Sequence, residues 1–271
     1  MKQESKLVLG GHSYIGELGS DPEAPSGEQE AIVAECLDHG ITTFDTTYQP
    51  ERVALGRILE RLGRRNEATI IAWNFFTPRE RDFVKAGAEA YRPESLETML
   101  AELRTDRLDM MVVHGVDDPA ADAAQLELAL GWKKRGLVGS LGTWWPSADT
   151  PSGPFGFMVR PWNVTQLAER PVFESGQRKG WRTYACSPFV RGWKLAELAA
   201  KAAAESRAKV EEARGKLADH MLRFSACQPF VDRLIVAIRK REWVRRNLES
   251  LARGPLDPEE GAWLEVLASG G

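Results

Sequence analysis

The stretch from Gly40 to Trp73 reads GITTFDTTYQPERVALGRILERLGRRNEATIIAW and holds one complete strand–helix–strand unit. Residues 41–44 and 69–72 are short, nearly continuous apolar runs, a pattern typical of parallel strands that are buried on both faces. Between them, residues 51–62 show helical spacing and end at Gly63, which suits the left-handed turn that closes many helices. This order predicts parallel pairing of the two strands through a helical crossover.

The same alternation continues in both directions along the chain. It predicts eight strands, at residues 7–9, 41–44, 69–72, 108–113, 138–141, 157–159, 182–185 and 234–236. It predicts helices at residues 29–38, 51–62, 93–103, 123–134, 195–224, 241–252 and 258–267. We expect the long segment 195–224 either as one helix or as two that separate near Gly215. Eight strands alternating with helices fit an α/β fold of the closed (β/α)8 TIM barrel type, formed by one domain over residues 1–271.

An open, doubly wound sheet fits the sequence less well. Dinucleotide-binding sheets of that type carry the glycine pattern G-x-G-x-x-G after the first strand. The first strand here is followed instead by Gly10-Gly11-His12-Ser13. The glycine pattern is therefore missing where an open sheet would need it.

One unit of the predicted barrel departs from the others. The segment after the fifth strand, residues 144–154, reads WWPSADTPSGP. Three prolines and a glycine within eleven residues disrupt helical hydrogen bonding. We therefore expect the fifth helix of the barrel to be shortened or missing.

Composition and charge limit the classes of partner. Hydrophobic residues make up 43% of the chain and charged residues 28%, which predicts a folded globular core. The formal net charge is −3 and no basic stripe is visible, so nucleic acid is not an expected partner. The three cysteines lack metal-ligand spacing, so no metal is expected. Without an apolar run long enough for a membrane or a signal peptide, we expect a cytoplasmic protein, whose oligomeric state the sequence does not predict.

The residues that follow the predicted strands indicate a small-molecule pocket. In parallel barrels, chemistry takes place at the C-terminal ends of the strands. The residues at these ends are His12, Asp45, Trp73, His114, Trp144, Asn163, Cys186 with Ser187, and Arg239. Asp45, Tyr48 and His114 are candidates for an acid–base group, because a tyrosine hydroxyl and an imidazole both transfer protons to carbonyl oxygens. The alternative is that Tyr48 packs in a loop and that His114 caps one.

Beginning at Asp45, the sequence resembles the aldo-keto reductases. The order of Asp45, Tyr48, Glu51 and Leu55-Gly56 is similar to a signature of that family. Further resemblances follow in the family's order, at residues 108–114, 135–142, 160–163, 187–192 and 235–248. Together they cover nearly the whole chain, so the resemblance implies the family's barrel fold.

The family reduces aldehydes and ketones with NADPH, and the resemblance implies a role for individual residues. Asp45, Tyr48 and His114 match the family's catalytic positions. The residues that match its NADP-binding positions are Asn163, Ser187, Arg191, Arg239, Lys240 and Asn247.

The sequence departs from the family at the end where hydride transfer takes place. The catalytic lysine, which lowers the pKa of the family's tyrosine and pairs with its aspartate, is replaced by Trp73. Loss of such a charged partner costs roughly 10²–10⁴ in rate. Thr143-Trp144 replaces the Ser-Asn pair that holds the nicotinamide amide, and Cys186 replaces an aromatic ring. Aromatic faces suit sugar rings, flat heterocycles or cations, and the expected substrate-binding residues are His12, Trp73, Trp144 and Trp162.

Three functions remain open at this stage. The first is an oxidoreductase that reduces a small carbonyl compound with NADPH through an atypical site of Tyr48, His114 and Asp45. The second is a non-redox enzyme, a lyase, isomerase or hydrolase, that uses the same three residues for proton transfer. The third is a binding protein that keeps the barrel without catalysis.

Overall fold

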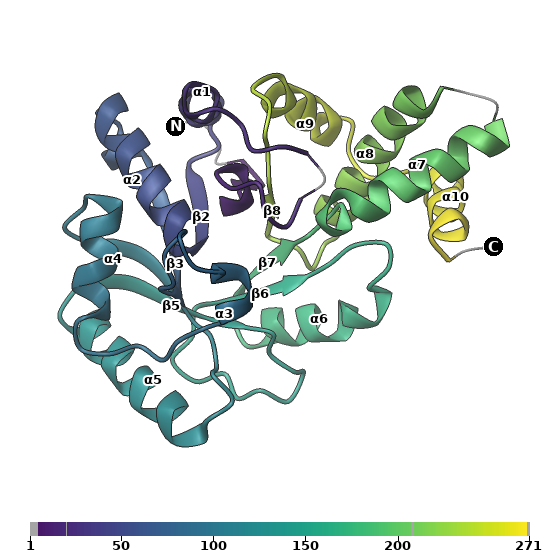
Figure 1. Cartoon of the computed structure of the whole chain (residues 1–271). Helices are drawn as coiled ribbons and strands as arrows, with labels where there is room; N and C mark the ends of the chain where they lie inside the picture. Colours follow the sequence, from purple (N-terminus) through teal and green to yellow (C-terminus); the bar gives the residue numbers. More distant parts are fainter. Residues whose placement is uncertain (1–4, 20, 207–208, 270–271) are drawn as a thin grey trace.

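Eight parallel strands form a closed barrel in the computed structural model, which describes residues 5–19, 21–206 and 209–269 (Figure 1). Each strand pairs with the next, and β1 pairs with β8 to close the ring. The strands are β1 (Leu7–Leu9), β2 (Thr43–Tyr48), β3 (Thr69–Phe75), β4 (Leu108–Val113), β5 (Val138–Trp144), β6 (Phe157–Pro161), β7 (Arg182–Cys186) and β8 (Arg233–Val236). The predicted (β/α)8 barrel is therefore confirmed.

Several strands run past their predicted ends. β2 pairs with β3 as far as Tyr48 and Phe75, with a register shift between Thr46 and Tyr48. As a result, Asp45 and Trp73 lie within strands and not in the loops after them. The apolar runs that predict the strands stop before these polar and aromatic residues, so the pattern did not show that the strands continue.

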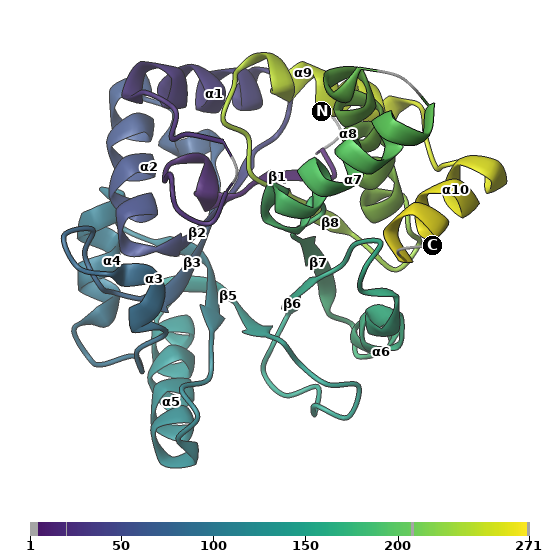
Figure 2. The ribbon, with the colours of Figure 1, turned by 45° about the vertical axis from the view of Figure 1, so that its right-hand side comes forward.

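The helices form the outer layer of the barrel. They are α1 (Ser26–Asp38), α2 (Gln49–Leu62), α3 (Phe83–Ala86), α4 (Ser95–Leu103), α5 (Pro119–Lys134), α6 (Arg170–Arg178), α7 (Trp193–Ser206), α8 (Val210–Ala226), α9 (Glu242–Ala252) and α10 (Pro258–Ser269). Figure 2 shows α2, α4 and α5 on one side of the barrel and α7, α8 and α10 on the other. Among the described residues, no helix is both long and apolar enough to cross a membrane.

Two expectations about the helices need correction. The 195–224 segment does form two helices, but they separate between Ser206 and Val210, and Gly215 lies inside α8. Packing of α8 against α7, α9 and α10 offsets the helix-breaking tendency of that glycine. Helix α6 was missed, because Gly176 weakens its helical pattern. A side chain at Gly176 would overlap with Met158 of β6, so the glycine allows close packing.

The segment between β5 and β6 confirms the expected loss of the fifth helix. Residues 145–156 are all described and contain turns but no helix. Trp145 adopts a positive φ of 51° directly after β5. The loop is held by side chains of neighbouring elements, since Ser175 of α6 donates a hydrogen bond to the carbonyl of Ala148.

Gly56 of α2 lies at a close contact between α2 and α4. A Cβ at this position would lie 2.7 Å from the backbone of Leu103 and would overlap with the carbonyl of Glu102, both in α4. Real Cβ atoms do not approach backbone atoms so closely, and a backbone contact has little freedom to move. The Leu55-Gly56 motif therefore sets how closely α2 approaches α4.

We predict that Gly56→Ala destabilises the protein by about 1–3 kcal/mol through overpacking. The matched control is Gly131→Ala in α5, where an added Cβ meets no described atom within 4 Å. That substitution should stabilise the protein by about 0.5–1 kcal/mol, since alanine is the better helix former. Urea unfolding measures both, and a neutral Gly56→Ala would contradict the packing argument.

Candidate active site

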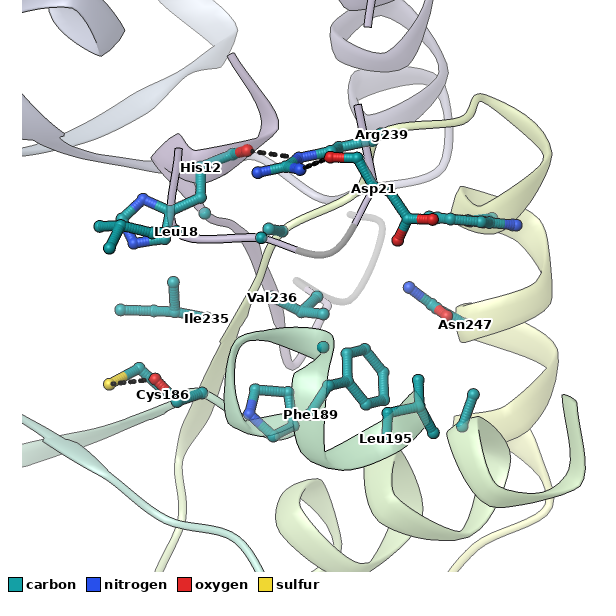
Figure 3. A pocket seen from close by; sticks show the side chains of 18 of the residues that line it. His12, Leu18, Asp21, Cys186, Phe189, Leu195, Ile235, Val236, Arg239 and Asn247 are labelled. Atoms are coloured by element: carbon teal, nitrogen blue, oxygen red, sulfur yellow. Dashed lines mark hydrogen bonds between the residues drawn. The ribbon is translucent and has the colours of Figure 1, made fainter. Parts of the chain in front are cut away.

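A cavity of about 1000 Å³ opens at the C-terminal ends of the strands. At the barrel mouth its walls are formed by Asp45, Tyr48, Trp73, His114 and Trp144. From there it continues past β7 and β8 to the helices α8 and α9 (Figure 3). We call these two parts the mouth lobe and the groove lobe. The groove lobe is lined, among others, by Ser187, Lys240, Trp243, Arg246 and Asn247.

Asp45 and Trp73 form the central contact of the mouth lobe. The indole Nε1 of Trp73 donates a hydrogen bond of 2.7 Å to Oδ1 of Asp45. Both side chains are buried, with exposed fractions of 4% for Trp73 and 5% for Asp45. Burial, and then the nearby charge of Glu51, raise the pKa of Asp45 to about 7, while the hydrogen bond from Trp73 opposes this rise. Asp45 is therefore a carboxyl group that exchanges its proton near neutral pH.

Arg52 fixes the backbone that carries Trp73. This arginine is fully buried in α2, and its guanidinium donates to the carbonyls of Trp73 and Phe75, at 2.9 Å each. Its charge is balanced by Glu102 of α4, with an Nε to Oε2 distance of 2.6 Å. Sequence reasoning missed this residue, because an arginine in a helical run is usually solvated. Its position next to the acidic signature residue Glu51 was the only available signal.

Tyr48 lies at the end of β2 among aromatic rings. It stacks on the imidazole of His12, with ring centroids 5.9 Å apart and an interplanar angle of 28°. Phe75 and Phe83 contact it edge-on, each at 5.1 Å between centroids. The exposed fraction of Tyr48 is 9%. Its ring therefore has a fixed orientation in the cavity wall.

His114 follows β4, and Phe75 of β3 contacts both its ring and the ring of Tyr48. Its ring stacks on Trp144 at 6.2 Å between centroids, and its Nδ1 lies 2.6 Å from the carbonyl oxygen of Gly115. Burial lowers the pKa of His114 from its ordinary value, so the imidazole is neutral at neutral pH. The buried side chain of Asn74 accepts a hydrogen bond from the backbone N–H of His114 and donates one to its carbonyl. His114 is thus a positioned, neutral hydrogen-bonding group.

A model of the aldo/keto reductase family matches residues 6–268. The chain belongs to the aldo-keto reductase family. Its fold is similar to that of an aldo-keto reductase from Bacillus halodurans in its holo form, at 19% identity and a TM-score of 0.69, covering 97% of this chain and 92% of that one. It is also similar to the glycerol dehydrogenase of Gluconobacter oxydans, at 16% identity and a TM-score of 0.70, covering 99% and 93%. No curated protein matches the sequence.

In this aldo-keto reductase, two of the predicted site residues lie outside the cavity. Trp162 is buried against Phe173, Phe224 and Phe230, between the barrel and its helices, so it does not line the pocket as expected. The side chain turns outward here because β6 ends at Pro161, and the chain leaves the barrel beyond it. Trp162 is therefore a packing residue in the structure and is not part of the cavity wall.

Asn163 also points away from the cavity, since its amide groups hold the loop after β6. Its Nδ2 donates to Gln166 and to the carbonyl of Ser187, and its Oδ1 accepts from the backbone and hydroxyl of Thr165. The side chain of Arg191 lies outside the described part of the structure. Of the other predicted NADP-binding residues, Ser187, Arg239, Lys240 and Asn247 line the groove lobe.

Arg239 is engaged by the chain itself. Its guanidinium donates to the backbone carbonyls of His12 and Asp21, which belong to the loop between β1 and α1 (Figure 3). It also donates to the carbonyl of Glu17 in the same loop. A Cβ at Gly19 would overlap with this guanidinium, so the loop passes directly over it. Arg214 of α8 also pairs with Asp21 at 3.1 Å. Arg239 therefore holds the loop through three of its N–H groups, and it also lines the cavity.

The raised pKa of Asp45 predicts a pH-dependent stability. The folded-state value of about 7 lies above the ordinary value of 3.8, so the folded protein binds more protons between these limits. Stability should therefore fall as the pH rises from about 4 to about 8, by roughly 4 kcal/mol from this group. Asp45→Asn, which keeps an acceptor for Trp73, should remove most of that slope. Urea unfolding of the wild type and of Asp45→Asn at about pH 4 and about pH 8 checks this. An equal change of stability with pH in the two proteins would contradict it.

Proposed function

We propose that this protein is an NADP-dependent oxidoreductase that reduces a small carbonyl compound. The observation that carries the proposal is the continuity of the cavity, which joins the acid–base residues of the mouth lobe to the long groove lobe. A small substrate alone would fill only the mouth lobe and leave the groove lobe empty. Its length suits a dinucleotide whose reactive end reaches the barrel mouth.

The groove lobe fits the phosphate end of such a cofactor. Lys240 lies two residues before the first residue of α9. The N-terminus of a helix favours anions through its free N–H groups and its dipole. Arg246 and Asn247 of the same helix also line the lobe. Because Arg239 is engaged by loop carbonyls, we assign the 2′-phosphate to Lys240 and Arg246.

The junction of the two lobes fits a flat, largely apolar ring. Its walls include Val159, Cys186 and Ile235, and the hydroxyl of Ser187 adds a polar group. A nicotinamide bound there would supply a hydride to the carbonyl carbon. This placement brings the ring next to the mouth lobe, where the acid–base residues lie.

The chain's own residues supply the proton and orient the substrate. Tyr48 donates the proton to the carbonyl oxygen, and Asp45 on the same strand serves as the group that exchanges protons near neutral pH. The neutral imidazole of His114 donates through Nδ1 to the carbonyl of Gly115, so its Nε2 is an acceptor and Tyr48 is the group that donates to the carbonyl oxygen. Trp73 and Trp144, in edge contact at 5.2 Å between centroids, exclude water around the reacting atoms.

Titration of the purified protein with NADPH tests the proposal, with tryptophan fluorescence as the readout. Trp73, Trp144 and Trp243 line the cavity, so binding should quench emission. Oxidation of NADPH, followed by its absorbance, should then depend on an added aldehyde or ketone. A silent titration, or binding without turnover of any carbonyl compound, would refute the proposed function.

The second candidate is a non-redox enzyme, and the pKa of Asp45 favours it. A carboxyl group that titrates at about 7 is suited to moving a substrate proton without any hydride donor. Exchange of substrate protons with deuterated solvent in the absence of NADPH separates this candidate from the first. If neither exchange nor reduction occurs and a ligand still binds unaltered, the protein acts by binding alone.

We predict that Lys240→Met and Arg246→Met weaken NADPH binding at least tenfold and leave NADH binding nearly unchanged. Arg239→Met should lower stability by about 1–3 kcal/mol, because it leaves buried loop carbonyls unpaired. Its ratio of NADPH to NADH affinity should stay close to that of the wild type. Fluorescence titrations and urea unfolding provide these values, and loss of NADPH preference in Arg239→Met alone would overturn the assignment.

A further inference from the structure

Glu51 is a fully buried carboxylate beside the mouth lobe that the proposed mechanism does not use. It lies in the first turn of α2, and its exposed fraction is 0%. One carboxylate oxygen lies 2.9 Å from Nδ1 of His12, and the other accepts the backbone N–H of Tyr48 at 3.0 Å. A buried carboxylate needs partners of this kind, so Glu51 holds His12 and the end of β2 together.

The sequence around β1 makes room for this contact. A Cβ at Gly11 would overlap with the carboxylate of Glu51, so the glycine allows Glu51 to reach the imidazole. The carbonyl of His12 accepts a hydrogen bond of 3.0 Å from Nε of Arg239. The hydroxyl of Ser13 bridges the carbonyl of Gly10 and the N–H of Ile238. Both the backbone and the ring of His12 are therefore fixed.

This arrangement sets the tautomer of His12. A carboxylate only accepts hydrogen bonds, so the neutral imidazole must carry its proton on Nδ1. Its Nε2 is then a hydrogen-bond acceptor. Within the described residues, Nε2 has no hydrogen-bond partner, while the His12 ring lines the cavity and stacks on Tyr48. The mouth lobe thus presents an acceptor that requires a donor on the bound molecule.

We propose that His12, oriented by Glu51, is the specificity-determining residue that selects substrates with a hydroxyl group next to the carbonyl. This inference rests on the proposed carbonyl reduction at the same site. The substrate hydroxyl donates to Nε2 of His12, while the carbonyl oxygen accepts from the hydroxyl of Tyr48. An analogue without the hydroxyl leaves this partly buried acceptor unpaired, so the enzyme stabilises the transition state of that analogue less.

Matched pairs of substrates test the proposal. Glycolaldehyde is compared with acetaldehyde, and hydroxyacetone with acetone, as the ratio of kcat/KM within each pair at about pH 8.5. His12→Phe keeps a ring on Tyr48 and removes the acceptor, so it should reduce that ratio at least tenfold relative to the wild type. Comparing ratios between proteins cancels the intrinsic reactivity of each carbonyl compound. An equal loss for both members of a pair would overturn the proposal, because it would indicate a merely structural role.

Glu51→Gln provides a second, independent variant. The glutamine amide can donate to Nδ1, which moves the imidazole proton to Nε2 and turns the acceptor into a donor. The ratio of kcat/KM for glycolaldehyde to that for acetaldehyde should fall. The kcat/KM for methoxyacetaldehyde should rise relative to that for glycolaldehyde. The control is His39→Phe, since His39 pairs with Glu35 at 3.2 Å on the outer helix α1. This control should keep the wild-type ratios.

Nitrogen NMR of the imidazole rings separates failure of this inference from failure of the proposed function. In the wild type, the His12 signal, assigned through His12→Phe, should show the Nδ1-protonated tautomer, and Glu51→Gln should shift it toward the Nε2-protonated form. A wild-type Nε2-protonated tautomer refutes the inference even if carbonyl compounds are reduced. Absence of reduction refutes the proposed function, and the tautomer then still decides whether Glu51 orients His12.

Discussion

The hydrogen bond between the indole of Trp73 and the carboxyl of Asp45 is the constraint on which the mouth lobe depends. A neutral N–H stabilises a buried carboxylate less than an ammonium group does. Burial, and then the charge of Glu51, therefore outweigh the hydrogen bond from Trp73, and the pKa of Asp45 rises to about 7. The rest of the mouth lobe is arranged around a carboxyl group that holds or releases its proton at neutral pH.

Two buried guanidinium groups make this arrangement rigid. Arg52 binds the backbone carbonyls of Trp73 and Phe75 on one side of the cavity. Arg239 binds three carbonyls of the loop after β1 on the other side. Both cations therefore stabilise walls and do not act as counter-charges for a ligand at the mouth. A site that relies on precise hydrogen bonds benefits from walls that do not move.

Most of the fold was predictable because each strand of a barrel carries a local apolar signature. The gathering of Asp45, Trp73, His114 and Trp144 followed from one rule, that parallel strands end at the same face. The helix α6 was not predictable, since its glycine serves a contact with β6 that only the packed structure reveals. Local sequence pattern thus predicts most helices and strands, whereas an element such as α6, which depends on a packing contact, is recognised only in the folded structure.

The errors in the site share a physical cause. The directions of Trp162 and Asn163 depend on how the chain leaves β6, which spacing does not specify. The partners of Arg239 lie more than two hundred residues away in sequence. Its charge and position suggested a phosphate ligand, and the structure adds that three of its N–H groups bind the loop between β1 and α1. Side-chain partners across such distances follow only from the assembled barrel.

The charges of the mouth lobe limit what it can accept. Asp45 and the adjacent Glu51 contribute negative charge, and the nearby guanidinium groups of Arg52 and Arg239 are engaged by backbone carbonyls. Among the described residues of the mouth lobe, an anionic substrate would therefore meet carboxylates and no lysine or arginine side chain. A neutral substrate meets aromatic faces and a small number of oriented polar groups instead. The indole of Trp73 thus supplies Asp45 with a hydrogen bond but adds no positive charge to the mouth lobe.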